Sequence, residues 1–323
     1  MNRVKRQELA KVAYLYYIEG WSQDQISKHL GIYRTTISRM LTQAKKDGIV
    51  QIKIQDFNPE ILKLETLFQE RYGLDHIEIV QSHPEDSETE KEEQLSKVAA
   101  QWIRKNIQDG DTIGLAWGAS IGKSISYIEP KYLENSTFVP IVGGPSRSNS
   151  RYHINTLVYD MAKKFHGKSI FVNATVVQES EELAKGIFNS KYFQELKENW
   201  KHLDMVILGV GGALSYKKSQ WRDLIDQNDY KELKLGEAVG DCCCRFFNQD
   251  GKILKGGLDN RTIGLSLDQL STIPKTVAIA RGNAKVRAIR ALIKRSYINT
   301  LITDQDTLMG ILKLDNIQME QSN

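Results

Sequence analysis

Six polar side chains crowd one short stretch near the start of the chain, and their chemistry suits hydrogen bonding to nucleic acid. They are Tyr33, Arg34, Thr35, Thr36, Ser38 and Arg39. Hydroxyl and guanidinium groups reach phosphate oxygens, and a guanidinium also matches the O6 and N7 acceptors of guanine in the major groove. If one helix face presents these groups together, that face can read double-stranded DNA.

The residues around this cluster have the pattern of a helix-turn-helix. Ser22 begins an S-x-x-Q pair, typical of a capped helix start, and Gly31 suits the left-handed position that follows a helix end. One helix is therefore predicted over residues 23–30 and a second over residues 33–47, where apolar residues recur at helical spacing. Ser22 and Gln23, at the start of the first helix, complete the predicted DNA-binding set.

A further helix and a further strand flank this pair. Residues 7–19 have the pattern of a supporting helix. Val50, Ile52 and Ile54 alternate with polar residues as in a half-buried strand, which we interpret as a wing. Residues 1–57 are therefore predicted to form a winged helix-turn-helix. The alternative is a plain helical bundle, since charges and hydroxyls on a helix are usually only a solvated face.

Positive charge is concentrated in the same segment. Residues 1–57 carry ten Lys and Arg side chains against five acidic ones, whereas the whole chain of 323 residues has a net charge of only +4. Binding to DNA phosphates with release of counterions needs such a distribution. The length suggests two or three domains, and the 41% hydrophobic and 26% charged content is that of an ordinary globular protein.

Neither a membrane span nor a secretion signal is predicted. No apolar run approaches the ~18 residues that a spanning helix needs, and MNRVKRQELA lacks the apolar core of a signal peptide. The three cysteines, Cys242, Cys243 and Cys244, are adjacent, so they suit neither a disulfide framework nor a shared metal ion. We expect them to be buried residues of a cytoplasmic protein with no membrane partner, no cofactor and no metal.

Residues 58–75 are predicted to form a helix that links the two halves of the chain. Its apolar residues are Ile61, Leu64, Leu67, Phe68 and Tyr72. This face has two interpretations: it is an oligomerisation seam, because paired readers bind palindromic operators, or it packs on its own domain. The acidic stretch from His83 to Glu93 is expected to be a loop.

From Glu92 onward, helical and strand-like patterns alternate, which predicts a doubly wound, mostly parallel α/β sheet covered by helices. The predicted strands are residues 112–117, 138–142, 169–172, 205–210, 242–247, 276–280 and 300–303. Helices are expected between most of them, for example over residues 154–165, 284–294 and 304–312. Such sheets bind ligands beyond the carboxyl ends of their strands, so residues 76–323 are predicted to be a ligand-binding domain.

One loop of this domain has the character of an anion site. GDTIGLAWGASIGKS, at residues 110–124, places Gly118, Ala119 and Ser120 between a strand and a helix. Backbone N–H groups and the Ser120 hydroxyl would there face an anion at the helix N-terminus. A Walker motif would need glycine at position 117, which is Trp117. We therefore predict a sugar phosphate or a similar small anion in preference to ATP.

Other predicted strand ends carry glycines and polar groups at the same rim. They are Gly143 and Gly144, Gly209 and Gly211, and Asp241. A glycine after a strand is usually only a turn, but several at one edge favour a ligand site. Lys285 could pair with a phosphate, and Arg147 or Arg245 with a second anionic group. A surface role for each arginine is equally open.

Seven segments occur in an order that resembles a known family. They are WSQDQISKHLGIYRTTISRMLTQAKKDGIV, GDTIGLAWGAS, VPIVGGPS, DMVILGVGG, GEAVGDCCCRFFNQDG, ARGNAKVRAIRALI and LITDQDT. Over residues 8–312 this order resembles the SorC family of bacterial sugar-responsive transcriptional regulators. The resemblance implies a winged helix-turn-helix, an effector domain similar to sugar-phosphate isomerases, a phosphorylated sugar effector, double-stranded operator DNA as partner, and assembly as a homodimer or homotetramer.

The same resemblance assigns roles to single residues. Gly118, Ala119 and Ser120 match the family's phosphate loop, and Lys285 its phosphate-facing lysine. Where the family often has a second hydroxyl residue, this chain has Ala119, and one hydrogen bond fewer, worth about 0.5–1.5 kcal/mol, implies weaker binding or a different effector. Tyr33 stands where a small hydroxyl residue is common, which implies an altered base preference.

The isomerase-like fold raises one rival function, a sugar-phosphate isomerase-like enzyme with an appended DNA-binding segment. Aldose–ketose chemistry needs a carboxylate or a histidine as a base beside the sugar carbons. Asp241 is the only acid placed at the rim, and His153, beside the Gly143 loop, is more typical of a helix cap. We therefore predict no catalytic residue, and a sugar-responsive regulator of a carbohydrate-utilisation operon.

Overall fold

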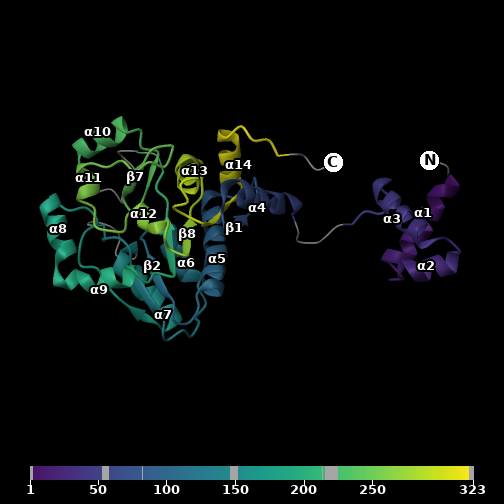
Figure 1. Cartoon of the computed structure of the whole chain (residues 1–323), viewed down its shortest axis with the longest axis horizontal. Coiled ribbons are helices and arrows are strands. Elements are labelled where there is room, and N and C mark those ends of the chain that lie inside the picture. The colour runs from purple at the N-terminus through teal and green to yellow at the C-terminus, as the bar shows by residue number, and fades with distance from the viewer. Residues whose placement is uncertain are drawn as a thin grey trace. The chain divides into compact units, whose positions relative to one another are not determined.

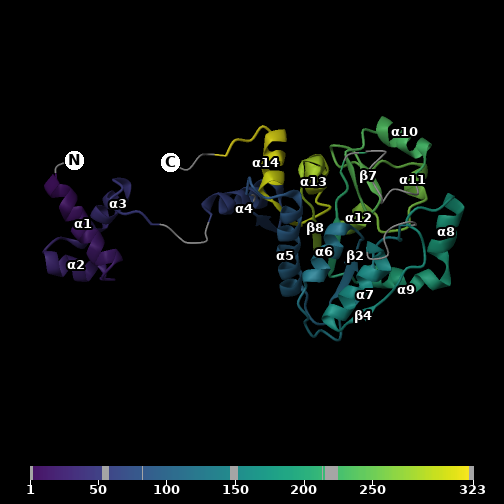
Figure 2. The same cartoon turned by 180° about the vertical axis from the view of Figure 1, so that it is seen from behind.

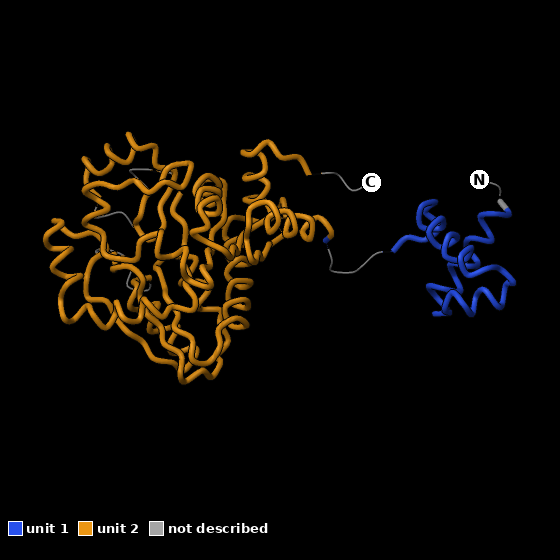
Figure 3. The backbone as a smooth tube through the Cα atoms, viewed as in Figure 1, with its two compact units in different colours: residues 1–58 blue, residues 59–323 orange. Residues whose placement is uncertain are grey.

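The computed structural model describes residues 3–52, 58–81, 83–145, 152–212, 214 and 225–319. The chain divides into two compact units, Met1–Asn58 and Pro59–Asn323, drawn in blue and orange in Figure 3. Each unit has its own cluster of buried apolar side chains. Each therefore meets the main requirement for a folding domain.

The first unit contains three described helices, α1 (Arg3–Tyr17), α2 (Gln23–Leu30) and α3 (Arg34–Lys46), drawn in purple in Figure 1. The side chains that meet in its core are Leu9, Val12, Ala13, Ile26, Ile37, Leu41 and Ala44. Within α1 and α3 these positions lie three or four residues apart, or side by side at one edge of the stripe, so one face of each of these two helices is buried, and α2 adds Ile26.

The start of α2 and the turn that joins α2 to α3 are built as the sequence predicts. The Ser22 hydroxyl accepts from the Gln25 N–H at 3.3 Å, and the Gln25 side-chain oxygen accepts from the Ser22 N–H at 2.8 Å. These two bonds complete a capping box. Gly31 has a φ of 66°, the left-handed conformation that ends a helix. The two predicted helices and their turn are confirmed.

The predicted wing is not formed where the structure describes it. The N–H groups of Ile49 and Val50 both donate to the Ala44 carbonyl, at 2.9 and 3.1 Å, and fold the chain back onto the end of α3. Residues 50–52 therefore form no strand, although their apolar and polar residues alternate. Residues 53–55, the remainder of the predicted wing, lie outside the described residues.

The second unit is built on a seven-stranded sheet in which all neighbouring strands are parallel. In spatial order its strands are β1 (His76–Val80), β9 (Thr300–Asp304), β8 (Lys275–Ile279), β5 (Met205–Gly209), β2 (Thr112–Leu115), β3 (Thr137–Pro140) and β4 (Lys168–Ser169). The chain runs outward from β2 to β4 on one side and from β5 through β8 to β9 on the other. The order thus reverses between β2 and β5, as in doubly wound folds, and the predicted architecture is confirmed.

Helices connect and cover these strands. They are α4 (Pro59–Tyr72), α5 (Glu88–Asn106), α6 (Ala119–Tyr127), α7 (Ile154–Phe165), α8 (Glu181–Asn189), α9 (Lys191–Trp200), α10 (Gln227–Leu235), α11 (Gly257–Asn260), α12 (Leu267–Leu270), η2 (Asn283–Lys285), α13 (Val286–Lys294) and α14 (Gln305–Leu314). In Figure 1 and from behind in Figure 2, α5 lies beside α6 and α13 beside α14. Over the described residues, no helix has both the length and the apolar character needed to span a bilayer.

The helix predicted to link the two halves packs as part of the second unit. In α4, Leu64 and Phe68 are fully buried in that unit's core. Tyr72 stacks on Phe68 with ring centroids 4.6 Å apart, and its hydroxyl donates to the Asp315 carboxylate at 2.6 Å. This apolar face therefore packs on its own domain, and its use as an oligomerisation seam stays a prediction.

The strand predicted over residues 242–247 is wrong, because the chain turns back there. β6 (Gly240–Cys242) and β7 (Arg245–Phe247) form an antiparallel hairpin. Cys243 and Cys244 make its two-residue turn with φ values of 54° and 58°. Residues other than glycine rarely adopt these backbone angles, so the residue types gave no turn signal.

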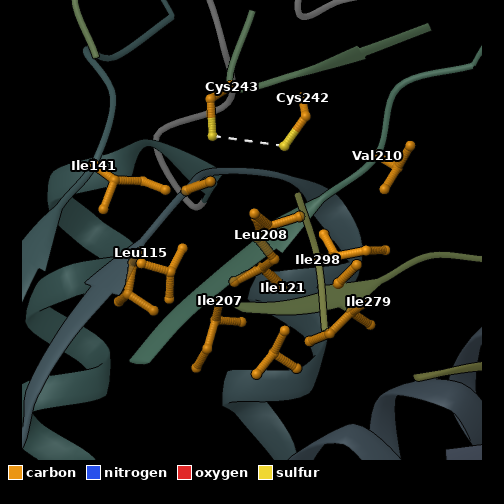
Figure 4. Close-up of a cluster of buried hydrophobic side chains, with 14 of the residues drawn as sticks. Leu115, Ile121, Ile141, Ile207, Leu208, Val210, Cys242, Cys243, Ile279 and Ile298 are labelled. Atoms are coloured by element: carbon orange, nitrogen blue, oxygen red, sulfur yellow. Dashed lines mark hydrogen bonds between the residues drawn. The ribbon is translucent and has the colours of Figure 1, made fainter. Parts of the chain in front are cut away.

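All three cysteines are buried, as expected. Figure 4 shows Cys242 and Cys243 next to buried apolar side chains of the second unit's core, among them Ile141 and Leu208 of β5. The hairpin therefore closes one end of the apolar core of the second unit.

β1 and the start of α5 were not predicted. Ser87 and Glu90 form a second capping box, so the acidic stretch interpreted as a loop becomes helical from Glu88 onward. Acidic residues also suit the first turn of a helix, because a negative charge there is attracted to the positive end of the helix dipole. The helical start places Glu92 on a fixed element, one turn after Glu88.

Candidate functional site

α3 presents the predicted DNA-binding residues to solvent. Ile37 and Leu41 are buried in the core of the first unit, which turns the opposite face outward. The exposed residues on and before α3 are Tyr33, Arg34, Thr35, Thr36, Ser38 and Arg39. Tyr33 is 85% exposed, so its ring and hydroxyl are accessible. The face can donate to phosphates and to base edges together.

The two predicted residues at the start of α2 are placed differently. The Ser22 hydroxyl is engaged in the capping box, since it also lies 3.0 Å from the Gln25 side-chain oxygen. Gln23 is half-buried. Arg34 lies 3.5 Å from Asp24 across the turn, in a solvent-exposed ion pair. Exposed pairs of this kind are weak, so Arg34 can exchange Asp24 for a phosphate.

In the second unit, the ends of β2 and β5 are neighbours at the point where the strand order reverses. Doubly wound sheets bind ligands at this point, beyond the carboxyl ends of the strands. Gly118, with a φ of 152°, caps α6, and Ala119 and Ser120 are the first residues of that helix. The first N–H groups of a helix have no partner within it and attract anions.

The β6–β7 hairpin brings Asp241 to the loop after β5. The Gly211 N–H donates to the Asp241 carbonyl at 2.8 Å, and the Asp241 N–H donates to the Gly211 carbonyl at 3.2 Å. Gly240 permits this approach, because a Cβ there would lie 2.3 Å from the Gly211 oxygen and 2.4 Å from Ala288 Cβ. Gly209, at the end of β5, is not crowded by other described atoms.

Lys285 brings a positively charged side chain to the loop that follows β5. A Cβ added to Gly212 would lie 2.5 Å from the Ala284 carbonyl oxygen and 3.5 Å from Lys285 Cγ, so the two loops touch. Burial lowers the pKa of Lys285, whereas the carboxylates of Glu92 and Asp241 act in the opposite direction. A half-buried ammonium group beside a helix N-terminus can pair with an anionic ligand.

Two charged residues at this rim were not found from the sequence. The Ser120 hydroxyl donates to Glu92 Oε1 at 2.6 Å. Arg281 lies 3.9 Å from Glu92 Oε2, and it pairs with Asp304 at 2.7 Å and with Glu88 at 3.0 Å. The Ser87 capping signal could have placed Glu92 on a helix. Nothing local could have aimed it at Ser120, which is 28 residues away in the chain.

Gly143 and Gly144, predicted to line the ligand site, have their backbone groups bonded within the protein. The Gly143 N–H donates to the Ile263 carbonyl at 3.0 Å, and its carbonyl accepts from the Trp117 ring N–H at 2.9 Å. Gly144 exchanges backbone bonds of 2.9 and 2.7 Å with residues 174–176. Both glycines are buried, so they serve close packing of the chain.

Arg245, predicted to pair with an anionic group of the ligand, is bonded within the protein. Its guanidinium donates to the carbonyl and the carboxylate of Asp259, both at 2.6 Å, and to three carbonyls within residues 262–265 at 3.1 to 3.5 Å. Since a guanidinium has five N–H donors, none is left for an effector. Arg147, the other predicted arginine, lies outside the described residues.

His153 is a helix cap. Its Nδ1 accepts from the Asn155 N–H at 3.3 Å. Burial lowers the pKa of His153, so the ring is neutral near pH 7. The capping interpretation is therefore confirmed. Within the described part of the chain, no group of His, Cys, Asp and Glu side chains is arranged to hold a metal ion.

Comparison with known proteins accounts for this combination of features. The Sugar-bind family model, which describes a sugar-binding domain, matches residues 58–313. The chain is 31% identical over 311 residues to the sorbitol operon regulator of Klebsiella pneumoniae, covering 94% of this chain and 97% of that protein. The chain belongs to the SorC family of sugar-binding transcriptional regulators.

Solved structures of similar regulators share the fold of this SorC-family chain. The crystal structure of the full-length sorbitol operon regulator SorC from Klebsiella pneumoniae matches with a TM-score of 0.75 at 29% identity, over 96% of this chain and 99% of that one. A transcriptional regulator from Streptococcus pneumoniae TIGR4 matches with a TM-score of 0.78 at 41% identity, over 81% of this chain and all of the other. The SorC-family chain is thus a transcriptional regulator with a sugar-binding domain, and a regulator is favoured over an isomerase-like enzyme.

Proposed function

We propose that this SorC-family regulator binds a phosphorylated sugar beyond the ends of β2 and β5, and that the sugar controls how α3 binds operator DNA. The observation that carries the proposal is that Glu92 links two groups: its carboxylate accepts from the Ser120 hydroxyl at the N-terminus of α6, and its charge acts on the half-buried ammonium of Lys285. In this arrangement Gly118, Ala119 and Ser120 hold phosphate oxygens and Lys285 balances their charge. Asp241 binds sugar hydroxyls.

On the DNA side, α3 enters the major groove of the operator. Arg34 and Arg39 reach guanine edges or phosphates, and Thr35, Thr36 and Ser38 bind the backbone. A homodimer or homotetramer in the cytoplasm places two copies of α3 on half-sites about one helical turn, ~34 Å, apart. The effector acts by its different affinity for two subunit arrangements, and so alters half-site spacing.

The proposed site binds its sugar without converting it. Isomerisation needs a base beside the sugar carbons. His153 is held as a neutral cap, and Asp241 is assigned to hydroxyl binding. Recovery of unchanged sugar phosphate after incubation with the protein is the expected result, and an isomerised product would favour the enzyme.

The proposal is tested with the full-length protein and an operator selected from a random DNA pool. Operator affinity and oligomer size are measured with a panel of sugar phosphates and with the parent sugars. We expect one sugar phosphate to shift either quantity, and Lys285→Ala to abolish the shift while operator binding persists. Lys313→Ala, an exposed change on α14, is the matched control. A response to a parent sugar alone, or a full response in Lys285→Ala, would overturn the phosphate assignment.

A further inference from the structure

The carboxylate of Glu92 occupies the place where the proposed function puts an anion. α5 carries this side chain to the first turn of α6, where Oε1 accepts from the Ser120 hydroxyl at 2.6 Å. The Glu92 side chain is only 19% exposed. The hydroxyl that a phosphate would use is therefore already bonded to a negative charge of the protein itself.

A second basic group lies within reach of the same carboxylate. Arg281 is 3.9 Å from Glu92 Oε2, which is longer than a hydrogen bond. The Arg281 guanidinium is 9% exposed and is held in place by Asp304 at 2.7 Å. A small rotation of the Glu92 side chain can therefore exchange its bond to Ser120 for a closer pair with Arg281.

The charges at this rim oppose the binding of a phosphate as long as the Glu92 carboxylate is bonded to the Ser120 hydroxyl. The charged side chains are Arg281 and Lys285 on the positive side, and Glu88, Glu92, Asp241 and Asp304 on the negative side. Asp304 cannot leave easily, because it is buried and caps α14 through the Thr307 N–H at 2.9 Å. Glu88 is 80% exposed, so water screens its charge. Glu92 is thus the carboxylate that must move away when a phosphate binds.

We propose that Glu92 is an internal competitor of the effector. Without ligand its carboxylate holds Ser120 and ties α5 to α6. An anionic effector takes over Ser120 and displaces Glu92 toward Arg281. This inference rests on the proposed phosphate site, and it adds a route for the signal, since α5 follows α4 and β1, the elements next in sequence to the DNA-binding unit.

A simpler role for this bond predicts a different result. If the bond between Glu92 and Ser120 only stabilises the contact of α5 with α6, removing the charge of Glu92 leaves ligand affinity unchanged or lowers it. If Glu92 competes, removing its charge raises the affinity for an anion. Glu92→Gln separates the two, because its amide oxygen still accepts from Ser120 while the negative charge is gone.

The experiment measures the Kd of inorganic phosphate for the full-length protein by calorimetry at constant ionic strength. We expect Glu92→Gln to bind phosphate roughly tenfold more tightly than the wild type, since one negative charge near the ligand is removed. Glu93→Gln is the control, because Glu93 neighbours Glu92 but pairs with Lys97 at 2.7 Å. Glu93→Gln should leave the Kd unchanged. A Kd for Glu92→Gln that equals or exceeds the wild-type value would overturn the inference.

Lys285→Ala, added to Glu92→Gln, separates failure of this inference from failure of the proposed site. The proposed site is wrong if the double variant keeps full phosphate affinity, or if neither the wild type nor Glu92→Gln binds phosphate. In either case the inference about Glu92 is wrong as well. If Lys285→Ala abolishes binding but Glu92→Gln never tightens it, only the competitor is wrong.

Hydrogen exchange of the wild-type protein gives a readout that needs no variant to fold. Phosphate should speed amide exchange in residues 91–96 of α5, because the bond that ties this helix to α6 is lost. Ordinary ligand binding slows exchange near a site. Slower or unchanged exchange in this segment at saturating phosphate would contradict displacement of Glu92.

Discussion

The guanidinium of Arg245 lies 2.6 Å from the carboxylate of Asp259, and both side chains are largely buried. This pair fastens the β6–β7 hairpin, which carries Asp241, to the segment that begins with α11. Arg245 therefore contributes to the proposed effector site only by holding an element in place. That relationship leads to a prediction that separates a structural role from a ligand-binding role.

Arg245→Met should lower the free energy of unfolding by roughly 3–5 kcal/mol, because it leaves the buried Asp259 carboxylate without its partner. Protein that remains folded should still respond to the effector. Chemical denaturation followed through the second unit's tryptophans measures the first quantity. Lys201→Met, which breaks an exposed pair with Glu198, should cost less than about 1 kcal/mol. A stable Arg245→Met protein that has lost its effector response would contradict the structural role.

Arg39→Ala should weaken operator binding by about 1–3 kcal/mol if the side chain reads a base, and should lower the salt dependence by about one counterion if it binds a phosphate. Arg39 lies on the exposed face of α3, opposite the buried Leu41 stripe. Fluorescence anisotropy over a series of salt concentrations distinguishes the two outcomes. Lys185→Ala, in an exposed pair with Glu181 on the second unit, is the control. If Arg39→Ala has the affinity and the salt dependence of the wild type, the assignment of α3 to the DNA interface would be contradicted.

Two glycine substitutions should change stability in opposite directions. Gly31 and Gly186 both have open space around the position of a Cβ, so steric contact does not decide either case. Gly31 has a φ of 66°, and Gly31→Ala should destabilise the first unit by about 1–2 kcal/mol. Gly186 lies inside α8 with helical angles, and Gly186→Ala should stabilise the second unit by about 0.5–1 kcal/mol. Calorimetric melting of both variants is the measurement, and the same sign in both would contradict the backbone argument.

The three thiols should react slowly with a water-soluble disulfide reagent until the protein unfolds. A hydrogen bond to the Cys243 sulfur, 3.9 Å away, and then burial raise the pKa of the Cys242 thiol. The reactive thiolate of Cys242 is therefore scarce at pH 7 to 9, and burial blocks access to all three sulfur atoms. Reaction in native buffer and in denaturant gives the ratio of rates. Fast reaction of any one thiol in the native protein would show that the hairpin opens.

Local sequence patterns were sufficient to predict the helices and strands that conform to them. The apolar stripe of α3 and the capping signal at Ser22 depend on residues only a few positions apart, and the structure has both as predicted. The strands of the seven-stranded sheet other than β1 are short apolar runs and were also predicted. The run predicted as a strand over residues 242–247 is divided by a turn of Cys243 and Cys244 and lies outside that sheet.

The site residues depended more on contacts between distant segments. Glycine identity alone does not distinguish Gly211, beside Asp241, from Gly143, whose N–H donates to the Ile263 carbonyl and whose carbonyl accepts from the Trp117 ring. The partner of Arg245 is 14 residues away, and that of Ser120 is 28 residues away on another helix. Such pairings follow from strand order, which residue spacing does not reveal.

The ion pair of Asp315 with Arg290 predicts how acid affects the second unit. Burial raises the pKa of Asp315, but hydrogen bonds from Arg290 and from the Tyr72 hydroxyl outweigh it and leave the pKa below its usual value. A depressed folded-state pKa means that this stabilisation is complete above the unfolded value of about 4 and is lost as the pH falls through the folded value. Asp315→Asn should therefore melt lower than the wild type at pH 7, and the difference should shrink toward pH 3. Asp306→Asn, which removes an exposed carboxylate on α14, should show neither effect. A difference in melting temperature that stays constant from pH 7 to pH 3 would mean that the carboxylate charge does not stabilise the contact between α4 and α14.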